Sequence, residues 1–423
     1  MIQAIRINKY LPIALLYFFF NGFLLPAGLL YTTILTPLFL VWLSGFPIFK
    51  KIWLFFIVAI PFVLVHLYNG VNTTYYLRSF LLLFSVYVFA LAFYQVLTLC
   101  QTMRLIYKRI LLLNVAFIII ALIALYIPSL KGRFWYSNEI TSGVETVRLK
   151  MLTYEPSYYS ILFVPIALYY YLKLVILKLP NPFITFVLLT APLLLSLSFG
   201  VILGLVLALL FTFLLGSRRF FPNKNVPIYI ALAGIVFLLL LILATQLFPN
   251  NVFVVRIANA LSGRDTSFKG RTFDSFYLGW EIAAKKSLLF GCGFGQTKEL
   301  GIDLFNNLYS TTSYTVQTVG IPNSLGDTLS TLGIVGLILR LYLEIYFFFK
   351  TKVNTNYYRL ALFLFIFIYQ FTGSFITNIA EYAIWVMAFH QNIFSEFDKA
   401  SFRNYFPSGK GLKAHTGNSI EPA

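Results

Sequence analysis

Four basic residues in one short stretch have the types and spacing expected for binding an anion. They are Arg256, Arg264, Lys269 and Arg271, and a glycine stands directly before Arg264 and before Arg271. A guanidinium group matches two oxygens of a phosphate, and glycines let backbone N–H groups approach an anion closely. We therefore expect these residues to bind a phosphate or diphosphate group.

A second polar segment supplies a carboxylate that can accept a proton. It reads Arg148-Leu-Lys150-Met-Leu-Thr-Tyr-Glu155-Pro156-Ser157. Pro156 suits the first position of a helix, because the N–H that proline lacks would be unpaired there. Glu155 then lies at the positive end of the helix dipole, either as a simple acidic cap or as a catalytic base at the mouth of a cavity. Arg148 and Lys150 would add positive charge beside it.

Other polar positions are weaker candidates. Asn323 and Asp327 are four residues apart and share one helical face, where they would line a cavity, although an ordinary helix start explains Asn323 equally well. His66 is either an interfacial polar tip or a functional group. Arg340 and Glu381 are candidates for a buried pair, but their spacing in the sequence does not join them.

Two groups of glycines lie near these candidates in the sequence. The run Gly291-x-Gly293-x-Gly295 has no strand before it, so we interpret it as a tight turn and not as a dinucleotide site. Gly333 and Gly336 lie three residues apart in an apolar run. We expect them to permit close packing between helices.

The composition predicts that these residues lie in a membrane protein. Hydrophobic residues make up 59% of the 423 residues, charged residues 11%, and the mean hydropathy is +0.82. A soluble domain has about 45–50% apolar and about 25% charged residues, so a soluble fold is excluded. The chain has two cysteines and three histidines, which exclude a disulfide framework and make a bound metal improbable.

Continuous apolar runs predict an all-α polytopic fold with about twelve transmembrane helices. Strands of a membrane barrel would alternate in polarity, and these runs do not. The predicted helices are 11–25, 28–44, 52–68, 77–99, 109–127, 156–178, 183–198, 200–216, 227–247, 322–349, 357–377 and 380–395.

Lysine and arginine in alternate loops predict the orientation, with both termini in the cytoplasm. We expect one integral membrane domain over 1–398, starting with an uncleaved helix, and a disordered basic tail over 399–423. Two long outer loops, 128–155 and 248–321, contain many basic residues. Either long loops translocate regardless of charge, or these two line an outer anion site. Within the second, 272–287 predicts an interfacial helix with an aromatic face.

Several motifs together resemble the O-antigen ligase and polymerase superfamily. The resemblance lies in Gly270-Arg271, Trp280, Gly291-x-Gly293-x-Gly295, Asn323 and Leu332-Gly333-x-x-Gly336-Leu, with the twelve-helix layout and the long outer loop. It implies a membrane enzyme of the GT-C glycosyltransferase type, acting on polyprenyl-diphosphate-linked glycans at the outer face of the bacterial cytoplasmic membrane.

Two departures favour a polymerase over a ligase. Ligases commonly have a histidine before the asparagine that matches Asn323, and here the residue is Pro322. The family often has Ser-Arg-Gly where this chain has Ser198-Phe199-Gly200. The segment from Arg148 to Ser157 resembles polymerases of O-antigen, capsule or exopolysaccharide repeat units.

The resemblance implies a reaction in which an acceptor sugar hydroxyl attacks the anomeric carbon of the donor and lipid diphosphate leaves. We expect Glu155 as the base and Arg271 as the main catalytic cation, with substrate contacts from Arg148, Lys150, Arg256, Arg264, Lys269 and Asn323. Inversion, no cofactor and no metal are expected. The implied partners are donor and acceptor lipid-linked glycans, the bilayer and a chain-length regulator, but no nucleic acid.

Two alternatives remain: an O-antigen ligase that transfers polymer to lipid A core, and a flippase for lipid-linked oligosaccharides. A transporter should place charges inside its spans. The apolar runs contain almost no charge, and the polar segments fall in outer loops. This pattern favours chemistry at the outer surface.

Overall fold

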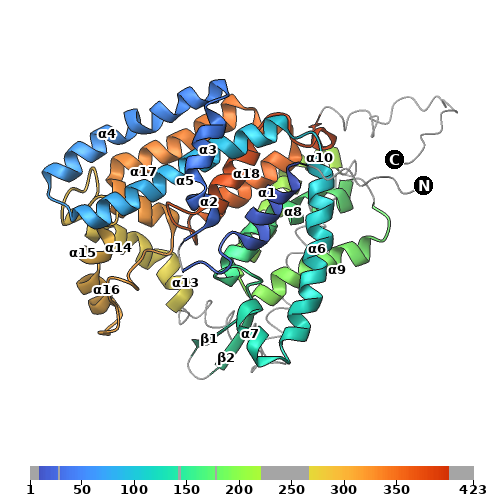
Figure 1. Cartoon of the computed structure of the whole chain (residues 1–423), viewed down its shortest axis with the longest axis horizontal. Coiled ribbons are helices and arrows are strands. Elements are labelled where there is room, and N and C mark those ends of the chain that lie inside the picture. Colours follow the sequence, from blue (N-terminus) through green and yellow to red (C-terminus); the bar gives the residue numbers. More distant parts are fainter. Residues whose placement is uncertain (1–8, 27–28, 142–143, 177–178, 221–265, 400–423) are drawn as a thin grey trace.

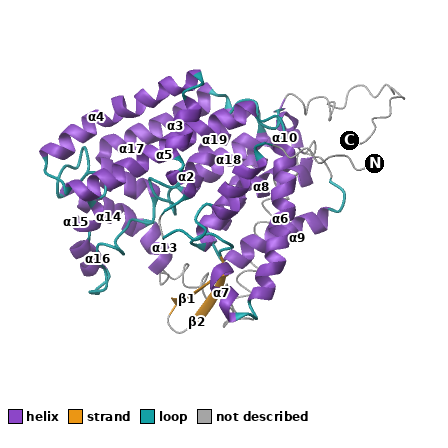
Figure 2. Cartoon of the chain, in the orientation of Figure 1, coloured by secondary structure: helices purple, strands orange, loops and turns teal. Residues whose placement is uncertain are grey.

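The computed structural model describes residues 9–26, 29–141, 144–176, 179–220 and 266–399. The described chain is mostly helical, with one small pair of strands (Figure 2). The predicted helix 227–247 lies outside the described residues.

The N-terminal helices follow the apolar runs, with two differences. The predicted helix 11–25 ends at Phe20, and the predicted helix 28–44 divides at Leu35, where Pro37 begins a new first turn. The elements are α1 (Leu11–Leu15), the π-helical turn η1 (Leu16–Phe20), α2 (Tyr31–Ile34), α3 (Thr36–Leu43), the 3-10 turn η2 (Pro47–Lys51), α4 (Ile52–Tyr68), α5 (Thr73–Leu99) and α6 (Met103–Ala124).

The first long loop contains local structure that an all-α prediction misses. It comprises α7 (Pro128–Phe134) and an antiparallel hairpin of β1 (Trp135–Thr141) and β2 (Val144–Leu149). The Trp135 indole donates a 2.7 Å hydrogen bond to the carbonyl of Ala121, which fixes the hairpin to the end of α6. The hairpin is a local exception that the apolar runs do not predict, and the described fold remains mostly helical.

The C-terminal half provides the helices that surround the candidate site. They are α8 (Pro156–Ile176), α9 (Pro182–Ser196), α10 (Phe199–Phe220), α13 (Thr266–Arg271), α14 (Phe273–Ala284), α15 (Thr297–Leu300), α16 (Ile302–Leu308), α17 (Ser324–Lys350), η3 (Val353–Thr355), α18 (Tyr357–Tyr369), α19 (Ile379–Phe389) and η4 (Ser395–Phe397). Asparagines 72, 323, 356 and 378 cap α5, α17, α18 and α19 with their side-chain oxygens.

Helix α8 is the centre of the core. It packs against α9, α10, α18 and α19, and most of its residues are buried. In Figure 1 the hairpin and α7 lie along the lower edge, near the N-terminal end of α8. The hairpin and the polar segment that follows it are therefore connected directly to α8, which is mostly buried.

Six described helices are long and apolar enough to cross a membrane, by length and composition. They are Pro47–Tyr68, Thr73–Leu99, Met103–Ala124, Pro156–Ile176, Phe199–Gly216 and Ser324–Lys350. Four shorter apolar helices accompany them: Leu11–Phe20, Pro182–Ser196, Tyr357–Tyr369 and Ile379–Phe389. A polytopic membrane protein is consistent with this structure, and twelve spans stay a prediction.

Helix α17 is broken at Gly333, where φ is 67° and ψ is −166°. Beyond the break, Nη1 of Arg340 lies 3.4 Å from the carbonyl oxygen of Ser324. In a straight helix these two residues would be about 24 Å apart along the axis. The two halves of α17 are therefore folded toward each other, where the sequence predicts one continuous helix.

The glycine run 291–295 lies against this break and satisfies its exposed peptide groups. The N–H groups of 334–335 donate to the carbonyls of 288–289 at 3.0 Å, and the carbonyls of 330–331 accept from the N–H groups of 292–293 at 2.8 and 3.1 Å. A Cβ at Gly291 would lie 2.4 Å from the Thr331 carbonyl oxygen. These glycines thus have a structural role, as the sequence predicts.

The amphipathic helix predicted at 272–287 is present as α14 and presents the expected face. Leu278, Gly279 and Ile282 are buried against its neighbours, while Phe273 and Tyr277 are largely exposed. Gly279 packs so closely on α17 that a Cβ there would lie 2.6 Å from the Gly326 carbonyl oxygen. Small residues therefore join α14 to α17, and aromatic residues cover its outer side.

Basic side chains lie at the end of the bundle opposite the hairpin, which we name the basic end. Arg104, at the start of α6, forms a 2.7 Å ion pair with Glu396. Lys51 lies 5.7 Å from the ring centre of Tyr94, near the end of α5. Arg359 donates a 2.7 Å bond to the Thr351 carbonyl after α17. Three of the loops predicted to be inner thus lie at this end.

Candidate functional site

Glu155 and Arg271 line one small polar cavity at the N-terminal end of α8. The cavity has a volume of about 130 Å³. Its lining residues come from four separate segments of the chain: Glu155, Ser157, Tyr158, Ile161, Arg271, Pro322, Tyr369, Ser374, Phe375 and Asn378. The two residues predicted to be catalytic are therefore brought together by the fold.

Arg271 presents free hydrogen-bond donors to this cavity. Its guanidinium makes no hydrogen bond or ion pair with any other residue that the structure describes. By contrast, the guanidinium of Arg340 is bonded on several sides by protein groups. An anion in the cavity would therefore find the N–H groups of Arg271 unoccupied, which is the requirement for a preorganised anion site.

The backbone that carries Arg271 is held in place by its neighbours. The Ser275 hydroxyl donates to the Gly270 carbonyl at 2.5 Å, and the Tyr309 hydroxyl donates to the Asp274 carboxylate at 3.1 Å. A Cβ at Gly270 would lie only 3.0 Å from the Tyr309 oxygen. Gly270 thus allows the Tyr309 loop to pack directly on the turn that positions Arg271.

Asn323 lies behind the cavity and connects two of its walls. Its side chain is fully buried, and its oxygen caps α17 by accepting from the N–H groups of Leu325 and Gly326. Its amide nitrogen donates to the carbonyl of Arg271 at 2.8 Å and to the carbonyl of Phe371. In this structure Asn323 is a helix cap that positions Arg271, and its direct contact with substrate stays a prediction.

Glu155 directly precedes the first residue of α8, as the sequence predicts. Ser157, in the first turn of α8, donates a very short hydrogen bond to its carboxylate. The Thr153 hydroxyl donates to the main-chain carbonyl of Glu155 at 2.9 Å. Ser157 therefore holds the carboxylate at the cavity wall, and Thr153 holds the backbone that carries it.

Arg148 lies beside the site but not among its lining residues. Its Nε donates to the Ser196 carbonyl at 3.0 Å, and its Nη2 lies 3.4 Å from the Ser198 hydroxyl. A cation at the last carbonyls of α9 is favoured by the helix dipole. Arg148 therefore places a guanidinium at the Ser198-Phe199-Gly200 turn, where the family often has an arginine at the position of Phe199.

The other predicted cations are less closely placed. Lys150 is half-buried beside the hairpin, and burial lowers the pKa of its ammonium group. Lys269 is exposed at the end of α13. Arg256 and Arg264 lie outside the described residues. Of the predicted basic residues, the described structure brings Arg271 alone into the cavity with Glu155.

Sequence reasoning missed the part of the cavity wall that follows α18. Tyr369, Ser374 and Asn378 line the cavity, although the run 357–377 is mostly apolar. Asn378 caps α19 and donates to the Ser374 hydroxyl at 2.9 Å. The signal for this wall in the sequence is the polar group Thr372-Gly373-Ser374 at the end of an apolar helix.

An ionic network inside the helices lies next to this wall. Ser374 donates to Glu381 at 2.5 Å, and Glu381 forms an ion pair with Arg340. Arg340 also pairs with Glu344 at 3.1 Å and donates to Gln370 at 2.9 Å. This network departs from the expected near absence of charge within the spans, because Arg340 pairs both with the nearby Glu344 and with Glu381, which lies 41 residues away in the sequence.

His66 has a structural role. Its Nε2 lies 2.7 Å from the Phe290 carbonyl, its Nδ1 lies 3.1 Å from the Tyr76 hydroxyl, and the side chain is buried. Nε2 therefore donates and Nδ1 accepts, so both ring nitrogens are used. The His66 side chain connects α4 to the loop that supports the break in α17.

Comparison with known proteins finds a family that part of the chain resembles. Residues 184–341 match the family model described as O-antigen ligase, and this segment contains Arg271 and Asn323 but not Glu155. No curated protein matches the sequence significantly. The apolar helices and the family match together indicate an integral membrane protein. This match covers less than half of the chain and supports a likeness to the O-antigen ligase/polymerase superfamily.

Proposed function

We propose that this protein polymerises polyprenyl-diphosphate-linked repeat units into a surface polysaccharide, such as O-antigen, capsule or exopolysaccharide. One observation carries the proposal: Glu155 and an arginine with free donors, Arg271, line the same polar cavity. A carboxylate beside an unpaired guanidinium suits proton removal from a hydroxyl and binding of a diphosphate leaving group.

In the proposed reaction Glu155 removes the proton from the acceptor hydroxyl as the oxygen attacks the anomeric carbon of the donor. The bond between that carbon and the diphosphate oxygen breaks, and the negative charge moves onto the lipid diphosphate. Arg271 stabilises this charge as it develops. Asn323 and Ser275 keep the backbone of Arg271 in place. We propose inversion at the anomeric carbon and no metal.

The remaining site residues act around this pair in the proposal. Lys150 and Lys269, with Arg256 and Arg264, attract the anionic lipid-linked substrates by their charge. Arg148 holds the turn before α10. Because each cation lies in a predicted outer loop, the proposed active site faces the outside of the cytoplasmic membrane, with the basic end and both termini in the cytoplasm.

Residues 1–398 form one membrane domain in this proposal, with a basic tail over 399–423. The domain has the GT-C type of fold that the resemblance implies. Its partners are the two lipid-linked glycans, the bilayer and a regulator of chain length.

A ligase is the second candidate, because the family model that matches residues 184–341 is described as O-antigen ligase. A flippase is less well supported. The buried charges of Arg340, Glu344 and Glu381 bind one another and Gln370, so they are committed to internal contacts. A charge that serves a transport pathway has to face that pathway.

The proposal is tested by the surface and lipid-linked glycans of a deletion strain, separated on a gel. If the protein is a polymerase, the deletion strain should contain single repeat units in place of a ladder of polymer lengths. A normal-length polymer that remains on its carrier lipid would instead identify a ligase. Repeat units trapped on the cytoplasmic face would identify a flippase and remove the site assignment at Glu155 and Arg271.

A further inference from the structure

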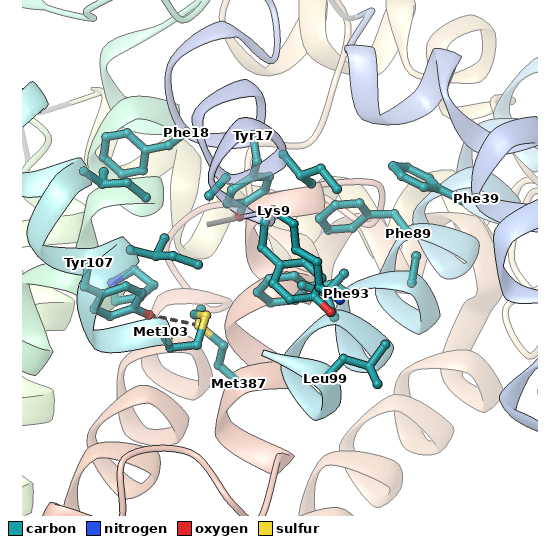
Figure 3. Close-up of a pocket in the computed structure, with 18 of the residues that line it drawn as sticks. Lys9, Tyr17, Phe18, Phe39, Phe89, Phe93, Leu99, Met103, Tyr107 and Met387 are labelled. Atoms are coloured by element: carbon teal, nitrogen blue, oxygen red, sulfur yellow. Dashed lines mark hydrogen bonds between the residues drawn. The ribbon is translucent and has the colours of Figure 1, made fainter. Parts of the chain in front are cut away.

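A large apolar cavity lies apart from the candidate site. It has a volume of about 520 Å³ and is lined by residues of α1, η1, α3, α5, α6, α8 and α19. Figure 3 shows aromatic side chains on several sides of it, including Tyr17, Phe39, Phe89 and Phe93. A space of this size and polarity suits a long hydrocarbon chain.

The two cavities have no lining residue in common. They meet different positions of α8: Ile161 lines the polar site, whereas Leu162, Pro165 and Ile166 line the apolar cavity. The apolar cavity also contacts Leu99 and Met103, on either side of the turn between α5 and α6. It therefore extends from the middle of α8 toward the basic end of the bundle.

One charge lies at this cavity. Lys9 is the single ionisable Lys, Arg, Asp, Glu or His among the described residues that line it, and its side chain is exposed. Lys9 lies two residues before the helical segment 11–20, and Figure 3 shows it beside the cavity. The described lining residues supply no carboxylate to neutralise it. The cavity thus combines an apolar interior with an exposed ammonium group.

We propose that this cavity binds an anionic phospholipid, with one acyl chain inside it and the headgroup phosphate at Lys9. The choice of occupant rests on the attraction between the Lys9 ammonium group and an anionic headgroup. A chain that entered from the polar site would leave Lys9 without an anion, whereas a phospholipid of the basic-end leaflet places its phosphate at the level of Lys9. The site lies outside the proposed reaction, and its test needs no activity.

The test uses brominated lipid chains, which quench tryptophan fluorescence on contact. Purified full-length protein in delipidated micelles is titrated with phosphatidylglycerol or phosphatidylcholine that carry identical dibrominated chains. Trp42 lines the cavity, so the difference between the wild type and Trp42→Phe isolates its signal. We expect half-maximal quenching at about fivefold lower concentration with phosphatidylglycerol, the effect expected of one lysine near an anionic headgroup.

Variants of Lys9 separate this site from general affinity for anionic lipids. Lys9→Gln should remove the preference for phosphatidylglycerol, and Lys9→Arg should keep it. Lys50→Gln is the matched control, because Lys50 is exposed at the same end but does not line the cavity. It should behave as the wild type.

Four results would overturn the proposal. The first three are equal quenching by both lipids in the wild type, an unchanged preference in Lys9→Gln, and no quenching of Trp42 by either lipid. A fourth is displacement of phosphatidylglycerol by a polyprenyl phosphate with equal affinity in the wild type and Lys9→Gln. That result would assign the cavity to an isoprenoid chain.

Discussion

The side-chain amide of Asn323 donates a 2.8 Å hydrogen bond to the main-chain carbonyl of Arg271. The same nitrogen donates to the carbonyl of Phe371, so one buried side chain ties the Arg271 segment to the segment that follows α18. Both segments line the polar cavity. The position of the Arg271 guanidinium therefore depends on Asn323, which is buried and does not line the cavity.

Asn323→Ser separates the capping role of this side chain from its bond to Arg271. Serine still caps the N-terminus of α17, because its hydroxyl accepts from the same N–H groups. It is too short to reach the Arg271 carbonyl. We expect normal protein levels and a loss of polymerising activity of about 100-fold, the effect of misplacing a catalytic group by about 1 Å.

The matched control for this prediction is Asn72→Ser, which replaces the asparagine cap of α5 outside the cavity. It should retain activity in the same glycan-ladder assay. Equal activity in Asn323→Ser and the wild type would remove the positioning role of Asn323.

Arg340→Ala should destabilise the protein through its buried charges. The change leaves the carboxylates of Glu344 and Glu381 buried without their cation. Breaking a buried ion pair from one side costs about 3–5 kcal/mol, so we expect a lower thermal unfolding midpoint of the purified protein. Arg133→Ala, at an exposed position of α7, should leave the midpoint unchanged. A shift of equal size in both variants would argue against the network.

Three glycine substitutions test the support of the broken helix. Gly291 has a positive φ and no room for a Cβ, Gly70 has a positive φ and open space, and Gly320 has open space without a positive φ. We expect Gly291→Ala to abolish folding, Gly70→Ala to cost about 1 kcal/mol, and Gly320→Ala to be tolerated. The amount of each variant in the membrane and its thermal unfolding midpoint measure the order of these three effects. Normal levels of Gly291→Ala would contradict the close backbone contact at the break.

The ionisation of the Cys292 thiol provides a measure of how the loop at the break in α17 is packed. Burial raises the pKa of its thiol to about 12, whereas an unfolded cysteine has a pKa of about 8.5. The folded thiol stays protonated as the pH rises through this range, while the unfolded thiol ionises. The contribution of Cys292 to stability is therefore complete below about pH 8.5 and falls as the pH rises.

A maleimide should consequently react slowly with Cys292 in the folded protein at pH 8 and rapidly after unfolding. The measurement uses a Cys100→Ser background, because the sequence has two cysteines. Rapid labelling of the native protein would show that the loop at the break is open to solvent.

Local sequence patterns predict most individual helices. The start of α8 follows from Pro156, and α14 follows from the helical spacing of aromatic residues between 272 and 287. Apolar runs identify α4, α5 and α6 because burial in the membrane and burial in the core require the same residue types.

The errors occur where distant segments determine the structure. Gly333 resembles a helix-packing glycine, and its role as a break depends on the peptide groups of 288–293. The hairpin at Trp135–Leu149 had a weak signal, the Ser142-Gly143 turn dipeptide between two short runs. Arg340 and Glu381 pair across two helices, which no local spacing reveals.

The candidate site was predictable only in part, because local sequence patterns identify some of its residues and the packing of distant segments supplies the others. Charge type and the proline signal identified Glu155, and the glycine beside Arg271 identified that arginine. Tyr369, Ser374 and Asn378 complete the wall only through the packing of α18 and α19 against α8. Arg148 was expected to bind substrate, but it does not line the cavity, and its contacts with Ser196 and Ser198 depend on the fold of α9.

The most direct test of the central claim measures chain growth by Glu155→Gln and Arg271→Ala in the deletion strain, with Arg133→Ala as the control. We expect both site variants to reach normal levels in the membrane but to lose activity by on the order of 100–1000-fold, so that single repeat units replace the glycan ladder. Arg133→Ala should restore the ladder. A full ladder from both site variants would show that the cavity between Glu155 and Arg271 is not the active site.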